Sequence, residues 1–382
     1  MRRSAGRMLT RLVVSVLATA LVACAPVRSM NTASIPGGDA FGVIAQTLLD
    51  SAASKYRRVA PSYDPGKGYP HSTRADGTWS TVPVSDWTSG FFPGTLWYLH
   101  DYTLDPVLRA QAERFTLPIA AVESNAYEHD LGVRFSSSFG NAYRVTRDER
   151  FRERLLDAAR HLANDDRRAG ATRSWNASDR NVPALLETTM NLEPLLWGAS
   201  HGGDTAWREV ARRRGLATLA SADSATRARD QAFGLYGYTL LYRETRDARF
   251  LSAARRLAGN ALERLPDDFV PCIDLKAPVC PDRAQRDASA AAIMASALLE
   301  LSTFVRGDDS VSYRTTAEQM LESLASPGYL APNGNAALLL HSVGDRSEMD
   351  VGIVYADYYL VEALLRYLQL SGQSGVRVLD AR

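Results

Sequence analysis

A repeated junction between helices limits the folds that this chain can adopt. At each junction one helical pattern ends, a short turn of Gly, Arg or Asp follows, and a new helix opens with Asp and an aromatic residue about one turn later. The Asp can cap the new helix, and the aromatic ring can pack on the helix before it. The junctions fall, more loosely at the first and last, at Asp105, Asp148, Asp204, Asp247 and Asp308. Their spacings of 43, 56, 43 and 61 residues are lengths of helix pairs and indicate an array of αα-hairpins.

Helical periodicity dominates the chain from Phe41 onward, and the few β-rich runs are short. The predicted helices number about twelve and lie near residues 41–58, 88–101, 106–123, 134–146, 148–164, 183–200, 204–215, 224–244, 247–264, 286–304, 309–325 and 352–371. Six hairpins can close into a ring with one helix of each pair inside, so we predict an all-α fold, an (α/α)6 barrel. An open helical solenoid is the alternative.

The composition of the helices predicts which of them form the inner layer. Small and aromatic residues gather in four segments, at 87–94, 136–143, 231–238 and 288–293. Other helices, such as 148–164 and 247–264, carry charge on one face, as exposure to solvent requires. The long loops fall on one side of the array, at 58–87, 165–183, 265–286 and 326–351. A rim of long loops is where a cleft usually lies.

Residues 1–23 have the composition of a bacterial export signal. Four arginines and no acid precede an apolar stretch from Leu12 to Ala23, which is shorter than the roughly 20 residues that span a bilayer. The stretch ends Leu-Val-Ala-Cys24 and resembles a lipobox, so we expect lipidation at Cys24 and a periplasmic or outer-membrane-anchored lipoprotein. An ordinary signal peptide with an incidental cysteine is the alternative. Residues 24–40 have the composition of a flexible tether, and 41–382 are expected to form one domain.

Charge and cysteine content narrow the range of partners. The chain has 44 basic and 43 acidic residues, a formal charge of +1, and no basic tract. We therefore expect neither nucleic acid nor an anionic membrane surface as a partner, and membrane contact only through Cys24. In an exported protein Cys272 and Cys280 can pair and close the loop between them. We predict no metal site there, because the six histidines are scattered and none lies near these cysteines.

Two carboxylates are candidates for acid–base chemistry. Asp130 follows His129 at a glycine-marked turn before a helix of small residues. A carboxylate in such a place can be fixed by free backbone donors and aimed at a cavity, or can simply cap the helix. Glu187 interrupts an apolar helix start one turn before Asn191, where burial would raise its pKa toward neutrality. A capping role in the first helical turn is the alternative for Glu187.

Aromatic and polar residues near the same end of successive hairpins favour a sugar site. Trp87 precedes the second helix, Trp175 lies in a later loop, and Arg229, Gln231 and Phe233 open the eighth helix. Aromatic faces stack on the C–H face of a pyranose while neighbouring polar groups bind its hydroxyls, and Arg suits a carboxylate on that sugar. Each Trp taken alone is more typical of a core, but the recurrence at one end of the hairpins favours binding.

Seven segments together resemble a known family. They are SDWTSGFFPG at 85–94, HDLG at 129–132, SFGNAYR at 138–144, MNL at 190–192, QAFGLYG at 231–237, RDASA at 286–290 and ADYY at 356–359. These motifs, spread over residues 41–371, resemble the unsaturated glucuronyl hydrolases, glycoside hydrolase family 88. The resemblance implies an (α/α)6 barrel that removes the 4,5-unsaturated uronic acid left at the non-reducing end by polysaccharide lyases. It implies an acidic unsaturated oligosaccharide as substrate and neither a metal nor an organic cofactor.

The resemblance also implies roles for individual residues. In the family the vinyl ether of the unsaturated ring is hydrated, and the resulting hemiketal opens and expels the aglycone. The carboxylate at the position of Glu187 donates a proton to C4 and activates the water that adds at C5, and the carboxylate at the position of Asp130 holds ring hydroxyls and assists the transfer. The residues expected to stack on, grip or otherwise bind the substrate are Trp87, His129, Trp175, Asn191, Arg229, Gln231 and Phe233.

The sequence departs from the family pattern at four places. Glu187 stands where the family usually has Asp, Asp230 replaces a Gly, and Phe233 replaces a Trp. The stretch between Trp207 and Gln231 is shorter, so we expect the hairpin that carries a substrate-binding His to be missing. Two functions therefore stay open: an active unsaturated uronyl hydrolase, and a catalytically impaired relative that binds acidic sugars without turnover. A sugar epimerase or mannosidase is a third alternative, disfavoured because no pair of histidines falls near the expected cleft.

Overall fold

The computed structural model describes residues 40–122, 131–169, 189–277, 280, 282, 285–344, 348–376 and 378. The chain divides into two units after Gly38, and the second, Asp39–Arg382, is the subject below. The predicted signal peptide, most of the tether and Cys24 lie outside the described residues. Within the described part of the chain, no helix combines the length and apolar character needed to cross a bilayer.

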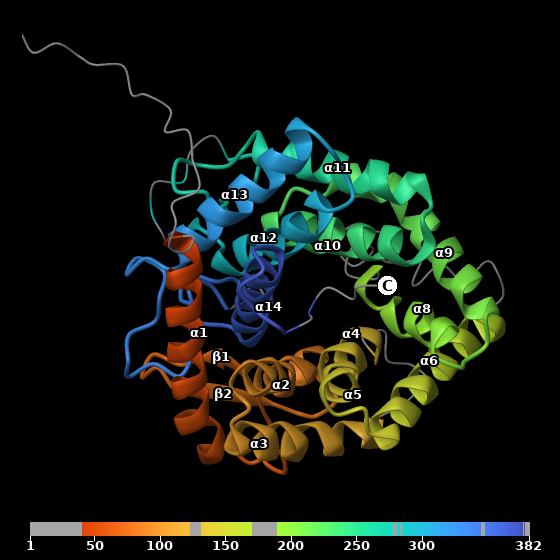
Figure 1. The fold of residues 1–382 in the computed structure, drawn as a ribbon, viewed down its shortest axis with the longest axis horizontal. Coiled ribbons are helices and arrows are strands. Elements are labelled where there is room, and N and C mark those ends of the chain that lie inside the picture. The colour runs from red at the N-terminus through yellow and green to blue at the C-terminus, as the bar shows by residue number, and fades with distance from the viewer. Residues whose placement is uncertain are drawn as a thin grey trace, which may run out of the picture. The chain divides into compact units, whose positions relative to one another are not determined.

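Six helical segments form an inner layer (Figure 1). Four of them are buried along most of their length, which is typical of helices enclosed by others: α2 (Phe91–Thr103), α10 (Ala228–Thr245), α12 (Ala288–Ser302) and α14 (Val354–Leu370). The fifth segment is a continuous run of α4 (Leu131–Phe135), the π-helical η4 (Ser136–Gly140) and α5 (Asn141–Thr146). The sixth is α8 (Glu193–Ser200).

Six outer helices surround this layer (Figure 1). They are α1 (Ala40–Val59), α3 (Pro106–Thr116), α6 (Glu149–Ala169), α9 (Ala206–Thr218), α11 (Ala248–Leu262) and α13 (Asp308–Leu324). α11 shows why they lie outside: its buried residues Phe250, Ala253, Ala254 and Leu257 form one apolar stripe, while arginines cover the opposite face. The sequence therefore assigned α6 and α11 to the outer layer correctly.

Contacts between successive inner helices close the ring. α2 packs on η4 and α5, α4 on α8, α8 on α10, α10 on α12, α12 on α14, and α14 again on α2. The predicted (α/α)6 barrel is confirmed, and the open solenoid is wrong. The segment from Trp207 to Gln231 runs through α9, η5 (Leu219–Ser224) and α10. The described residues thus contain both helices of all six pairs in the ring. The expectation that one hairpin is missing is therefore wrong.

The repeated junction folds as predicted at four of its five positions. The side chains of four aspartates accept hydrogen bonds of 2.7 to 3.1 Å from the backbone N–H two residues later: Asp105, Asp148, Asp204 and Asp247. At three of these the preceding residue ends a helix in the left-handed conformation: Leu104, Arg147 and Arg246. At the fifth position the cap is Gly307, with φ of 66°, and Asp308 lies inside the first turn of α13. The predicted cap at Asp308 is therefore wrong.

Loops far apart in sequence are joined at the end of the ring where the inner helices begin. The first loop folds into an antiparallel hairpin of β1 (Tyr69–Thr73) and β2 (Trp79–Val82). This hairpin bonds to the last loop, from Thr73 N to Gly352 O (2.8 Å) and from Ala336 N to Gly77 O (2.8 Å). A backbone carbonyl of the last loop in turn accepts a hydrogen bond from the backbone N–H at the start of α12. The described long loops therefore gather at one rim, as the sequence predicted, and we call this rim the front end of the ring.

Candidate functional site

Three aromatic side chains from different hairpins meet at the front end. Trp87 opens the short helix η2 (Trp87–Gly90), Phe233 lies in the second turn of α10, and Tyr355 lies in the first turn of α14. The ring centroid of Trp87 is 5.3 Å from that of Tyr355 and 6.2 Å from that of Phe233. Phe233 and Tyr355 are 1% and 0% exposed, whereas Trp87 is only half-buried. Trp87 therefore offers the accessible aromatic surface, and the other two rings support it.

The position of Trp87 follows from its sequence neighbours. Asp86 caps η2 by accepting a hydrogen bond from the backbone N–H of Thr88 at 2.8 Å, and the hydroxyl of Thr88 donates to the same carboxylate oxygen at 2.5 Å. Gly90 packs so closely on the backbone of Arg134 in α4 that a Cβ at this position would overlap it. The glycine in the 85–94 segment thus lets the start of α2 approach α4.

Arg229 lies beside the aromatic cluster of Trp87, Phe233 and Tyr355. It is 7% exposed, and its Nη1 donates to the carbonyl of Gly344 at 2.6 Å and to the hydroxyl of Tyr355 at 3.2 Å. The Tyr355 hydroxyl donates to the carbonyl of Val343 at 2.5 Å. Three predicted site residues, Trp87, Arg229 and Phe233, are therefore brought together, and Tyr355 is the residue that connects them.

Two buried carboxyl groups accompany Arg229. Asp230 is 1% exposed, and within the described structure neither of its carboxylate oxygens has a hydrogen-bond partner. Burial raises the pKa of Asp230, while Arg229 and Arg227 act to lower it and Asp287 acts to raise it. Asp287 caps α12 through a bond from Ala290 N at 3.1 Å, and burial raises its pKa as well. Both carboxyls therefore hold a proton more readily than an exposed Asp.

Gln231 and Asn191 make contacts within the protein. The side-chain amide of Gln231 donates to the carbonyl of Ala225 at 2.8 Å, which ties α10 to the chain that precedes it. Asn191 is 3% exposed, and its Oδ1 accepts from the backbone N–H of Val133 at 2.8 Å. Gly132 packs directly on the backbone of Asn191, leaving no room for a Cβ. The start of α4 and the turn before α8 are thus held together by these contacts.

The two predicted catalytic residues, Asp130 and Glu187, lie outside the described residues, as do His129 and Trp175. Their roles stay predictions. The described segments that follow the two carboxylates are nevertheless in contact with each other, because Val133 and Gly132 pack on Asn191. The ring therefore brings the chain positions just after both carboxylates to the same place.

A buried histidine near Trp87 was not predicted. His71, on β1, contacts the hydroxyl of Thr88 through Nδ1 at 2.8 Å and a carboxylate oxygen of Glu348 through Nε2 at 3.0 Å. It therefore links the cap of η2 to the loop before α14. Nothing in the local sequence marks this role, because Glu348 is 277 residues away along the chain.

A separate cavity of about 510 Å³ lies toward the opposite end of the ring, where α5, α8 and α10 finish. We call this the rear end. Its wall includes Tyr98, Arg144, Glu193, Trp197 and Arg243. Burial raises the pKa of Glu193 to about 7, although Arg243 acts to lower it. The sequence did not predict this cavity, and among the described residues no group of three or more His, Cys, Asp or Glu is arranged to hold a metal ion.

Comparison with known proteins places the chain in a family. No model of a known protein family matches it. An unsaturated glucuronyl hydrolase from Formosa agariphila is 33% identical over 328 residues, covering 75% of this chain and 80% of that protein. The chain belongs to the unsaturated glucuronyl hydrolase family.

Solved structures of the unsaturated glucuronyl hydrolase family share its fold. The crystal structure of an unsaturated glucuronyl hydrolase specific for heparin superposes with a TM-score of 0.78 at 35% identity, covering 86% of this chain and 98% of that one. The enzyme from Bacillus sp. GL1, described as responsible for the degradation of glycosaminoglycan, gives a TM-score of 0.76 at 26% identity, covering 84% and 96%. The high coverage of both relatives agrees with the complete set of helix pairs in this ring.

Several of the segments that resemble the unsaturated glucuronyl hydrolase family meet at the front end, whereas segment 138–144 lines the rear cavity. Segments 85–94 and 231–237 provide Trp87 and Phe233, and Tyr355 directly precedes segment 356–359. Segments 129–132 and 190–192 are joined at Gly132 and Asn191. Trp87, Phe233, Gly132 and Asn191 lie at or just before the starts of inner helices. Tyr236 and Tyr358, farther along segments 231–237 and 356–359, line the rear cavity.

Proposed function

We propose that this protein removes the 4,5-unsaturated uronic acid from the non-reducing end of oligosaccharides released by polysaccharide lyases. The observation that carries the proposal is the convergence of Trp87, Arg229 and Phe233 at the front end of a closed ring whose sequence belongs to the unsaturated glucuronyl hydrolases. An aromatic face beside a guanidinium suits a planar sugar ring that carries a carboxylate.

The proposed reaction hydrates the vinyl ether of the unsaturated ring. The sugar stacks on Trp87, and the positive charge of Arg229 attracts its carboxylate. Glu187 donates a proton to C4 and takes a proton from the water whose oxygen bonds to C5, while Asp130 holds ring hydroxyls and assists the transfer. The C5 hemiketal then opens, and the aglycone leaves with its own oxygen protonated. The net reaction consumes one water and needs no oxidant or reductant.

We propose fragments of glycosaminoglycans as the substrate class. The two solved relatives described above are associated with heparin and with glycosaminoglycan degradation. A disaccharide with an unsaturated uronate at its non-reducing end is therefore the first compound to test.

A catalytically impaired, sugar-binding relative is the second candidate. It is favoured by the surroundings of Arg229, which is buried, interacts electrostatically with Asp230 and Asp287, and already donates to Gly344 and Tyr355. A guanidinium engaged in this way is less available to a substrate carboxylate. Glu187, one methylene longer than the usual Asp, would also displace its carboxyl group from the position that the reaction needs.

The two candidates differ in an optical signal. Hydration removes the conjugated double bond of the unsaturated uronate, so turnover bleaches its ultraviolet absorbance. We expect the full chain to bleach an unsaturated glycosaminoglycan disaccharide, and Asp130→Asn and Glu187→Gln each to slow this about a thousandfold. Glu193→Gln is the matched control, because it makes the same chemical change at the rear cavity and should retain activity. Binding of the disaccharide without bleaching by the wild type would establish the second candidate instead.

We also propose that the protein is exported and anchored through a lipid on Cys24. The support is the sequence pattern of residues 1–24. Cys24→Ser should move the protein from the membrane fraction to the soluble periplasmic fraction of the host. Equal membrane association of wild type and variant would contradict the proposal.

A further inference from the structure

The loop between α11 and α12 runs alongside the start of α10. Ala228 N donates to the carbonyl of Ile273 at 3.0 Å, and Leu275 N donates to the carbonyl of Thr226 at 2.9 Å. Arg227 and Asp274 form the antiparallel bridge between these two bonds. The backbone immediately before Arg229 is therefore held in place by residues 273–275.

The same loop is bonded on its other side to the chain that enters α12. Ile273 N donates to the carbonyl of Gln285 at 2.9 Å, and Asp287 N donates to the carbonyl of Pro271 at 3.0 Å. An antiparallel bridge joins Cys272 to Arg286. Residues 271–275 are thus the middle one of three bonded segments, between the start of α10 and the start of α12.

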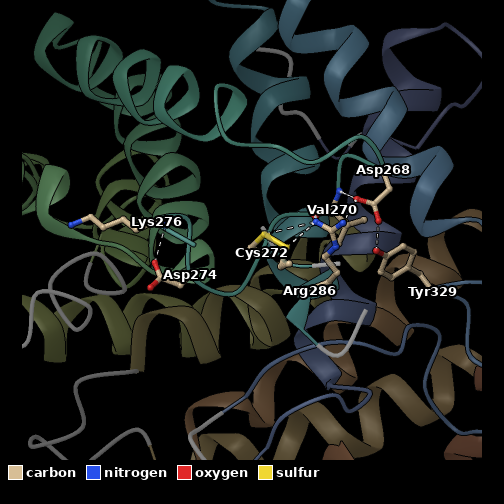
Figure 2. Close-up of a disulfide and its surroundings, with 8 residues drawn as sticks. Asp268, Val270, Cys272, Asp274, Lys276, Arg286 and Tyr329 are labelled. Carbon is tan, nitrogen blue, oxygen red and sulfur yellow. Dashed lines mark hydrogen bonds and ion pairs between the residues drawn. A yellow bond between two sulfur atoms is a disulfide. The ribbon is translucent and has the colours of Figure 1, made fainter. Parts of the chain in front are cut away.

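A disulfide closes the end of this middle segment. Cys272 and Cys280, which the sequence suggested could pair, are bonded to each other and are 6% and 5% exposed. Figure 2 shows the guanidinium of Arg286 beside the two sulfurs, with its Nη1 3.0 Å from Sγ of Cys280. Its Nη2 lies 3.4 Å from Oδ1 of Asp268, and the other carboxylate oxygen, Oδ2, accepts a hydrogen bond from the Tyr329 hydroxyl at 2.6 Å. The crosslink is therefore itself anchored to the start of α12.

We propose that the Cys272–Cys280 disulfide and Arg286 are positioning elements for the substrate site. They hold residues 271–275, which set where α10 begins and hence where Arg229 and Phe233 lie. The inference rests on the proposed function for the identity of the ligand. It gives the disulfide a role beyond closing a surface loop, because small displacements at a binding or catalytic constellation have large kinetic effects.

The arrangement also links substrate binding to the compartment of the protein. Disulfides form and persist in oxidising surroundings such as the periplasm, and are rare in the reducing cytosol. In the exported protein proposed above, the crosslink that holds the α10 end of the site would therefore form after export.

The test is the double variant Cys272→Ser/Cys280→Ser in the full chain, assayed with an unsaturated glycosaminoglycan disaccharide well below its melting temperature. We expect KM to rise about tenfold while kcat changes by less than about threefold. Calorimetry with the same disaccharide should show a matching loss of affinity. A disulfide that only stabilises the fold would lower the melting temperature and leave KM and Kd unchanged, and that result would overturn the inference.

A second variant keeps the disulfide and covers the case in which the double variant does not fold. Arg286→Lys retains the charge but cannot reach both the sulfurs and Asp268, and we expect KM to rise about threefold to fivefold. Arg255→Lys is the matched control, since Arg255 is exposed on α11 and pairs with Asp309 away from the loop. A KM for Arg286→Lys equal to that of Arg255→Lys would count against the positioning role.

The outcomes separate the two proposals. If the wild type binds the disaccharide without bleaching it, hydrolysis fails as the function, and the inference is still decided by comparing Kd between wild type and variants. If the wild type neither binds nor bleaches it, both proposals are wrong.

Discussion

The front and rear ends of the ring both contain buried carboxylates, but the two ends differ in how these carboxylates are bonded. At the rear, Glu300 accepts from Arg243 and Arg366, each at 3.0 Å, and is 3% exposed. At the front, Asp230 is equally buried, yet neither of its oxygens has a hydrogen-bond partner among the described residues. A buried charge without a partner is costly, and such groups concentrate at functional sites.

A second carboxylate at the rear end, Glu362, accepts hydrogen bonds from several helices. Glu362 is 2% exposed and accepts hydrogen bonds from the hydroxyls of Tyr98 at 2.9 Å, Tyr236 at 3.0 Å and Ser296 at 2.5 Å. These bonds connect α2, α10, α12 and α14 across the ring. Glu300 and Glu362 at the rear end are therefore engaged within the protein, whereas Asp230 at the front end has no hydrogen-bond partner among the described residues. Whether the buried carboxylates have hydrogen-bond partners distinguishes the two ends better than the volume of the cavity does.

The largest expected effect tests the structural role of the rear network. Burial acts to raise the pKa of Glu300, but Arg243 and Arg366 outweigh it and lower the pKa. Glu300→Gln removes the charge that both arginines face, and breaking a buried ion pair from one side typically costs about 3–5 kcal/mol of unfolding free energy. Urea unfolding would measure this loss, with KM unchanged at temperatures where the variant is folded.

The control for this prediction is a Glu outside the network. Glu263 is exposed at the end of α11, so Glu263→Gln should change the unfolding free energy by less than about 0.5 kcal/mol. A Glu300→Gln variant as stable as Glu263→Gln would show that the rear charges do not hold the ring together.

The next largest effect compares one tryptophan from each end. Trp87 offers its accessible face at the front, whereas Trp197 lines the rear cavity and is stacked on His201 at 4.2 Å with an interplanar angle of 7°. We expect Trp87→Ala to lower kcat/KM about a hundredfold, and Trp197→Ala to lower it by less than about threefold. Steady-state kinetics with the unsaturated disaccharide would measure both. Equal losses, or a larger loss for Trp197→Ala, would reverse the assignment of the two ends.

Sequence reasoning predicted the ring well because the ring depends on local signals. The caps at Asp148 and Asp247 each follow a helix end and precede an aromatic residue, so a few adjacent residues fix each turn. The length of a segment predicted the number of helix pairs less reliably than the helical pattern did. The short stretch between Trp207 and Gln231 suggested a lost hairpin, yet α9 and α10 are both present and only the connection between them is short.

The site was predicted only in part because its contacts join distant positions. Trp87, Arg229 and Phe233 were found from motifs, but Tyr355 connects to Arg229 across 126 residues and carries no local signal of that contact. Asn191 was expected to bind substrate, which stays a prediction, and the contact of its side-chain oxygen with Val133 N, 58 residues away, has no local signal. A single sequence gives the residue types of a site, whereas burial and bonding decide which of them face a ligand and which hold the scaffold.

The smallest of the three effects is a pH dependence at the rear end. Burial is the main cause that raises the pKa of Glu193 from 4.5 to about 7, with Glu362 acting in the same direction and Arg243 against it. The folded protein therefore binds this proton more tightly than the unfolded chain does. Between pH 4.5 and about 7 the folded state holds more protons, so this group makes stability fall as pH rises through that window.

Glu193→Gln removes this dependence because an amide does not titrate. The unfolding free energy of the wild type relative to the variant should fall by about 1–2 kcal/mol as pH rises from 4.5 to above 7, measured by urea unfolding at several pH values. All other titrating groups are shared by the two proteins and largely cancel in the difference. A difference that stays constant across the window would mean that Arg243 compensates the charge of Glu193 as fully as Arg243 and Arg366 compensate Glu300, and the rear end would then contain no strained charge at all.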